Sequence, residues 1–149
     1  MSTPYASTNT FSIADDKFYA YLAQDSHGSR CEVYMVNGQV VSHMAFQKAC
    51  IASLGDGAFV LHSLFCLELS LTPSKVEIPS GRTDFTVNGS TYGVTVGEQR
   101  PTWREMSVNG HQVGYEDFAR AVVDGCRSTA RVIRGALCGL NNECVDRAA

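Results

Sequence analysis

The tripeptide Val-Asn-Gly occurs three times in this chain of 149 residues, at 36–38, 87–89 and 108–110. Asn-Gly between apolar runs predicts a two-residue hairpin turn, because both central residues of a type I′ turn need a positive φ. Three such turns predict three antiparallel hairpins. No β-α-β alternation accompanies them, so a parallel Rossmann-type sheet is not expected.

Placing each Asn-Gly pair in a turn sets the register of its hairpin. The first turn pairs Tyr34 with Val41, and the ribbon is expected to continue until Cys31 faces Met44. One half-buried face of this ribbon would then carry Cys31, Val33, Met35, Val40 and Met44.

The second and third turns give shorter hairpins. The second pairs Phe85 with Tyr92, and the third places Met106 opposite Val113. Segments 87–93 and 108–114 resemble each other, and we interpret this as coincident turn chemistry because seven positions are too few to indicate a duplication.

The rest of the chain predicts two helices and further strands. Residues 45–54 have helical spacing, and 115–138 predict a long C-terminal amphipathic helix. Residues 17–23, 59–71 and 76–78 are expected to be strands. The predicted fold is α+β, a mostly antiparallel sheet of hairpins packed against the C-terminal helix. Its expected organisation is a flexible N-terminal tail over 1–14, which Phe11 and Ile13 dock, and a single domain over 15–149.

Composition narrows the class of protein. Apolar residues make up 44% and charged residues 18%, which is enough apolar material for a folded core. The net charge of −3 provides no global attraction to nucleic acid or anionic membranes. We expect no signal peptide and no membrane span, so the six cysteines are expected to be reduced, mostly buried thiols in a cytoplasmic protein.

Arginines form the sharpest pattern. All seven basic residues after position 99 are Arg, and four of them share one face of the predicted C-terminal helix: Arg120, Arg127, Arg131 and Arg134. A solvated helix face is the plainer interpretation. Guanidinium groups also suit carboxylates and interfaces, so these four residues are the candidate contacts for a protein with an acidic surface. Trp103, between two arginines, is a further candidate contact, or else anchors a loop to the core.

A cysteine-dependent hydrolase is an alternative. It needs a thiolate beside a base that a third group orients. His43 is a candidate base with Glu32 opposite it, and His62 is another. His62 and Cys66 would stand about 13 Å apart if 59–71 were a strand. No spacing indicates a metal site, and no motif implies a cofactor.

The function we expect is that of a non-enzymatic cytoplasmic accessory, adaptor or inhibitor protein that binds another protein. A nucleic-acid-binding protein that uses the arginine helix is less favoured, given the acidic chain. A homo-oligomer is a third possibility, because a free edge strand invites pairing.

Overall fold

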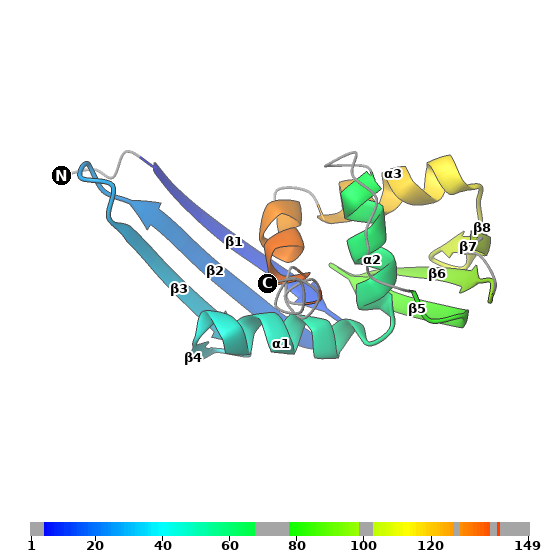
Figure 1. Ribbon diagram of the computed structural model, residues 1–149, viewed down its shortest axis with the longest axis horizontal. Coiled ribbons are helices and arrows are strands. Elements are labelled where there is room, and N and C mark those ends of the chain that lie inside the picture. Colours follow the sequence, from blue (N-terminus) through cyan, green and yellow to red (C-terminus); the bar gives the residue numbers. More distant parts are fainter. Residues whose placement is uncertain (1–4, 68–77, 99–102, 127–128, 138–139, 141–149) are drawn as a thin grey trace, which may run out of the picture.

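The computed structural model describes residues 5–67, 78–98, 103–126, 129–137 and 140. Its fold is α+β with an eight-stranded antiparallel sheet in the order β4-β3-β2-β1-β5-β6-β7-β8 (Figure 1). The strands are β1 (Tyr5–Ile13), β2 (Asp16–Gln24), β3 (Arg30–Val36), β4 (Gln39–Val41), β5 (Gly81–Val87), β6 (Ser90–Val96), β7 (Trp103–Val108) and β8 (His111–Gln112). The helices are α1 (His43–Leu54), α2 (Gly57–Phe65), α3 (Tyr115–Cys126) and a helical segment over 129–137.

One face of the sheet, called here the core face, carries most of the buried strand residues. Phe46 of α1 packs its ring against those of Phe11, Phe18 and Tyr34. Phe118 of α3 packs in the same way against Tyr92 and Trp103. The helices therefore lie on this face. Successive strand residues point to opposite faces, so the side chains between the core-facing ones form the outer face of the sheet.

All three predicted hairpins are confirmed. Tyr34 pairs with Val41 and Phe85 with Tyr92, and the Val113 N–H donates to the Met106 carbonyl. The first ribbon is shorter than predicted, because Ser42 ends the strand. Its Oγ accepts the Ala45 N–H and so caps α1.

The early end of β4 overturns part of the first prediction. Cys31 does not face Met44, because residue 44 already belongs to α1. The face expected to be half-buried is the outer one, where Cys31 and Val40 are exposed and Val33 is half-buried. The buried side chain of β3 is Tyr34, on the core face.

Two other predictions need correction. Residues 5–13 were expected to belong to a tail but form β1, with Phe11 and Ile13 buried. Residues 57–65 form α2 instead of a strand, because a helix buried on nearly all sides shows no useful periodicity. Most of the predicted strand at 76–78 lies outside the described residues. The predictions of a strand over 17–23 and a helix over 45–54 are confirmed by β2 and α1.

The long C-terminal helix is not confirmed. Helix α3 ends at Cys126. A second helical segment spans 129–137, and residues 127 and 128 lie outside the described residues. The two pieces pack in different places. Gln47 of α1 donates to the Gly135 carbonyl, so the second piece lies against the other half of the molecule (Figure 1).

The two halves repeat the same order of elements. Four strands, a helix and a second helical piece make up residues 5–65, and the same series makes up 81–137. We call these the N-terminal and C-terminal repeats. Phe46 and Phe118 are equivalent core residues, 72 positions apart. Asn37 and Asn109 are equivalent turn residues with the same spacing. The pair of similar segments noted in the sequence, 87–93 and 108–114, are different turns within one repeat.

Each turn asparagine also joins a neighbouring strand. The Asn37 N–H donates to the Lys17 carbonyl, and its Oδ1 accepts the Lys17 N–H at 2.8 Å. Asn109 makes the same two bonds with Thr91, and Asn88 makes them with Ser12. Each Val-Asn-Gly turn therefore closes its own hairpin and also bonds to a neighbouring strand of the sheet.

Candidate functional site

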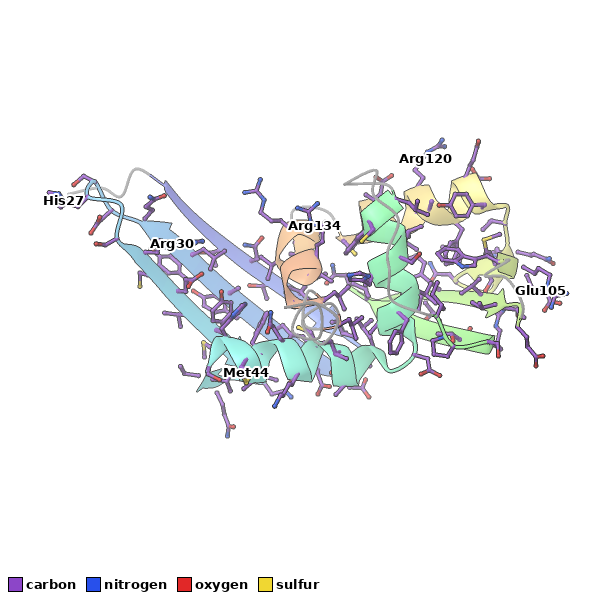
Figure 2. All side chains as sticks on the ribbon, viewed as in Figure 1. His27, Arg30, Met44, Glu105, Arg120 and Arg134 are labelled. Carbon is purple, nitrogen blue, oxygen red and sulfur yellow. The ribbon has the colours of Figure 1, made fainter. Side chains whose placement is uncertain are left out.

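The three arginines of this set that the structure describes, Arg120, Arg131 and Arg134, do not lie on one helix. Arg120 lies on α3, where its exposed guanidinium is 3.9 Å from Asp117, whereas Arg131 and Arg134 lie on the segment after the break. Figure 2 shows Arg120 and Arg134 on separate helices. Arg127 lies outside the described residues. The single long helix on which the arginine prediction rested is therefore not confirmed, and a contact role for any one of these arginines stays a prediction.

Trp103 sits at the start of β7 and is half-buried. Its ring centroid is 5.7 Å from that of Tyr115 and 6.1 Å from that of Phe118. These contacts fasten β7 to α3, which agrees with the anchoring interpretation.

A shallow hollow of about 410 Å³ follows the exposed side of α3. Its lining combines the carboxylates of Glu116 and Asp124 with one guanidinium, that of Arg120. Two negative groups and one positive group give this hollow no preference for an acidic partner.

Helix α2 brings His62 and Cys66 one turn apart, much closer than the strand prediction allowed. The Cys66 Sγ lies 3.9 Å from Nδ1 and 4.0 Å from Nε2 of His62. The lone-pair directions of the two ring nitrogens diverge, so a sulfur nearly equidistant from both lies off either axis. Burial also lowers the pKa of His62. This pair is a poor nucleophile and base.

The other candidate groups for chemistry are not assembled either. Glu32 accepts a hydrogen bond from the Tyr34 hydroxyl at 3.3 Å, and the His43 ring lies 4.8 Å from the Tyr34 ring at a tilt of 36°. Burial raises the pKa of the Cys50 and Cys126 thiols to about 12, which keeps them protonated. No group of three or more metal-ligating side chains occurs in the described part of the chain.

The outer face of the N-terminal repeat carries an apolar cluster. Tyr19 pairs with Met35 and Tyr21 with Val33 across β2 and β3, and Met35 pairs with Val40 across β3 and β4. Val40 is 71% exposed and the other four are half-buried. We call these five residues the outer patch: Tyr19, Tyr21, Val33, Met35 and Val40.

The same positions of the C-terminal repeat are not apolar. The Asn37 and Asn109 turns align the repeats and match Tyr19 with Gly93 and Tyr21 with Thr95. Cross-strand pairing then matches Met35 with Ser107, Val40 with Gln112 and Val33 with Arg104. The fold therefore accommodates polar residues or glycine at every position of the outer patch.

The edges of the two repeats differ as well. Strand β3 pairs with β2 without interruption from Arg30 to Val36. Its counterpart β7 has a register shift opposite Gly93 and Thr95, with Glu105 at a φ of 52°. Arg82 donates to the Glu105 carbonyl at 2.6 Å and so holds this bulge in place. A bulge discourages further strand pairing, whereas a regular edge does not.

No protein-family model matches the chain, and neither a curated protein nor a solved structure does. No helix in the described ranges is long and apolar enough to cross a membrane. The comparison that bears on function is therefore the one between the two repeats.

The sequence predicted three of the five outer-patch residues, Val33, Met35 and Val40, to share one half-buried face. A usable signal was the run Phe-Tyr-Ala-Tyr-Leu-Ala over 18–23, which is apolar on both faces of β2. A strand with one solvated face alternates between apolar and polar residues, and a strand covered on both faces does not. This run predicts that something covers the outer face.

Proposed function

We propose that the protein is a non-enzymatic cytoplasmic binding protein whose outer patch contacts a partner protein. One observation carries this proposal: the C-terminal repeat has polar residues or glycine wherever the N-terminal repeat has the outer patch. The apolar residues are therefore not required by the fold. Tyrosine and methionine are also enriched in protein interfaces.

The proposal keeps a protein as the partner, but it moves the contact from the arginines to the sheet and no longer expects an acidic partner surface. The patch contains no charged side chain, so it favours an apolar protein segment over an acidic surface or nucleic acid. An adaptor, accessory protein or inhibitor would use such a surface in the same way.

The alternative of a cysteine hydrolase is less well supported. It rests on the approach of Cys66 to His62, and the position of the sulfur off both lone-pair axes counts against it.

The test first traps the partner and then measures its affinity. A photo-crosslinking phenylalanine analogue replaces Tyr21 in one variant and Thr95, the equivalent residue of the C-terminal repeat, in the other. We expect cross-links to a partner protein from position 21 and few from position 95. Equal cross-linking from both positions, or cross-links only between copies of this chain, would overturn the proposal.

The trapped partner is then purified and its Kd measured by calorimetry. The variant Tyr21→Thr/Met35→Ser/Val40→Gln carries the C-terminal repeat's own residues, so the fold is expected to tolerate them. We expect binding at least tenfold weaker, the equivalent of about 1.4 kcal/mol or more. The matched control is Thr95→Ala/Ser107→Ala/Gln112→Ala, for which we expect an unchanged Kd. Unchanged binding by the folded patch variant would contradict the proposal.

A further inference from the structure

Part of β3 forms an open edge of the sheet. Strand β2 covers one side of β3 over its whole length, but β4 covers the other side only from Tyr34 to Val36. No described residue pairs with the remaining side of Arg30–Val33. Figure 1 shows this part of β3 at the rim of the sheet, beyond the end of β4, and Figure 2 shows Arg30 well away from the helices.

The backbone groups that face this edge belong to Arg30 and Glu32. In a strand, the N–H and C=O groups of successive residues point alternately to the two sides. The Asn37 N–H donates to Lys17 of β2, so the odd-numbered residues of β3 face β2. The even-numbered ones face the other side, where Tyr34 and Val36 meet β4. No described residue bonds to the N–H and C=O groups that Arg30 and Glu32 present on this side, so these groups can pair with an added strand.

The two side chains at these positions have opposite charges. Arg30 and Glu32 lie on the same face of β3, 3.7 Å apart, and their side chains are 66% and 42% exposed. Such an edge is complementary to itself when it runs antiparallel to a second copy. Residue 30 of each chain can then face residue 32 of the other.

Backbone direction and charge together select one register. A strand related by a twofold axis must place Arg30 opposite Arg30, Arg30 opposite Glu32, or Glu32 opposite Glu32. The first and third put like charges directly opposite, which destabilises a sheet. The third also brings Arg30 to Tyr34, where β4 already lies. The second makes two opposite-charge pairs and closes four backbone hydrogen bonds.

We propose that two copies of this chain associate through the Arg30–Val33 edges of β3, with Arg30 of each copy opposite Glu32 of the other. The sheet then continues across a twofold axis, and the two outer patches come to lie on one face. The bulge at Glu105 disfavours strand pairing at the equivalent edge of β7, so the C-terminal repeat is not expected to associate in the same way. The proposal does not depend on what the outer patch binds.

The first test is charge reversal, followed by analytical ultracentrifugation at concentrations up to about 100 µM. We expect the wild type to dimerise, and Arg30→Glu and Glu32→Arg each to weaken the dimer at least tenfold, because each places like charges opposite twice. The double variant Arg30→Glu/Glu32→Arg restores opposite charges and should dimerise like the wild type. An equimolar mixture of the two single variants should form heterodimers. Lys48→Glu, an exposed charge change on α1 of the same repeat, is the control and should dimerise normally.

The second test determines the register of the two β3 strands from disulfide formation between the Cys31 residues of the two copies. The proposed pairing places the two Cys31 residues opposite each other at the twofold axis, as a non-hydrogen-bonded pair. Their Cα atoms would be about 4.5 Å apart, within the range of a disulfide. With diamide, the two thiols lose two protons and two electrons to the reagent, which is reduced to its hydrazine form. We expect a covalent dimer that is lost in Cys31→Ser and retained in the Tyr21→Thr/Met35→Ser/Val40→Gln variant.

Several results would overturn this assignment. They are a wild type that stays monomeric up to the highest concentration, a double charge variant no better than the single ones, and diamide cross-linking that survives Cys31→Ser. Loss of the dimer in the outer-patch variant would instead show that the sheet face holds the copies together, which also contradicts pairing through the edge.

Discussion

The two repeats have the same architecture and different surfaces. The N-terminal repeat has an apolar outer face and a regular open edge, whereas the C-terminal repeat has a polar outer face and a bulged edge. Because both repeats fold on the same plan, the features that differ are not those that the fold needs. Binding is therefore expected at the N-terminal repeat. The C-terminal repeat serves as an internal reference that has the same fold but lacks the apolar outer face and the regular open edge.

The polar outer face of the C-terminal repeat is itself organised. Arg82 donates to Ser107 at 3.0 Å and forms an ion pair with Asp84 at 3.3 Å, directly above Gly93. A Cβ at Gly93 would lie 2.2 Å from the Arg82 guanidinium. The glycine thus leaves room for a polar network at the position where the N-terminal repeat has Tyr19.

Beneath these surfaces the repeats share one core. A Cβ at Gly57 would lie 2.7 Å from Phe85, so α2 of the N-terminal repeat is packed against β5 of the C-terminal one. In the opposite direction, α1 is bonded to Gly135 in the segment over 129–137. The second helical piece of each repeat thus packs on the other repeat, so we expect the halves to fold as one unit.

The largest expected effect tests this shared core. Phe46→Ala and Phe118→Ala each remove a fully buried ring from equivalent positions, and each is expected to cost about 3–5 kcal/mol of unfolding free energy. Urea unfolding should show a single transition in both variants, when followed by Trp103 fluorescence in the C-terminal repeat and by far-UV circular dichroism.

Two separate transitions, or a Trp103 transition untouched by Phe46→Ala, would show that the repeats fold independently. In that case each repeat could be produced alone, and the binding of the two repeats could be compared directly.

The hairpins could be predicted from sequence because turn chemistry is local. An Asn-Gly pair between apolar runs favours a type I′ turn, whose central residues need a positive φ, and Asn37, Asn88 and Asn109 all have one. The lateral bonds of these asparagines could not be predicted, since they depend on which strand lies alongside the turn.

Other features depend on tertiary packing. Helix α2 was predicted as a strand because burial on nearly all sides removes the polar residues that reveal a helical period. The predicted tail became β1 because it has partners on the sheet, which its own polar composition does not reveal. Val33, Met35 and Val40 were predicted to share a half-buried face, but the side of the sheet that this face occupies could not be predicted, because alternation in a strand shows that two faces differ and not which one the helices cover.

A smaller effect tests the equivalence of the turns. The Asn88 N–H donates to Ser12, and at the matching turn the Ala14 N–H donates to Thr86. Ala14 has a φ of 53°, which suits asparagine better than alanine. Ala14→Asn is expected to stabilise the protein by about 0.5–1 kcal/mol, because its Oδ1 would accept the Thr86 N–H.

The variant that matches Ala14→Asn in the opposite direction is Asn88→Gly. It keeps the positive φ and removes only the asparagine side chain. It deletes the bonds to the Ser12 N–H and the Gly125 carbonyl, each of 3.0 Å, and should cost about 1–2 kcal/mol in urea unfolding. Destabilisation by Ala14→Asn would show that the two turns are alike in backbone only.

The smallest expected effect is a difference in how acid affects α1 and α3. Asp16 accepts the Ser53 hydroxyl at 2.6 Å and the Asn37 amide at 3.0 Å, and these bonds hold the Asp16 pKa below its usual value. A lowered folded-state pKa means that the contribution of Asp16 is complete above the ordinary aspartate pKa, and that it is lost as pH falls through the lowered value. In the C-terminal repeat, the Asn88 amide links the sheet to the last turn of α3 by donating to the Gly125 carbonyl, and neither group is titratable. Hydrogen exchange, corrected for its intrinsic pH dependence, should therefore show the last turn of α1 losing protection below about pH 4 while the last turn of α3 keeps it. Asp16→Asn should remove this pH dependence from α1, and equal loss of protection in both helices would contradict the assignment to Asp16.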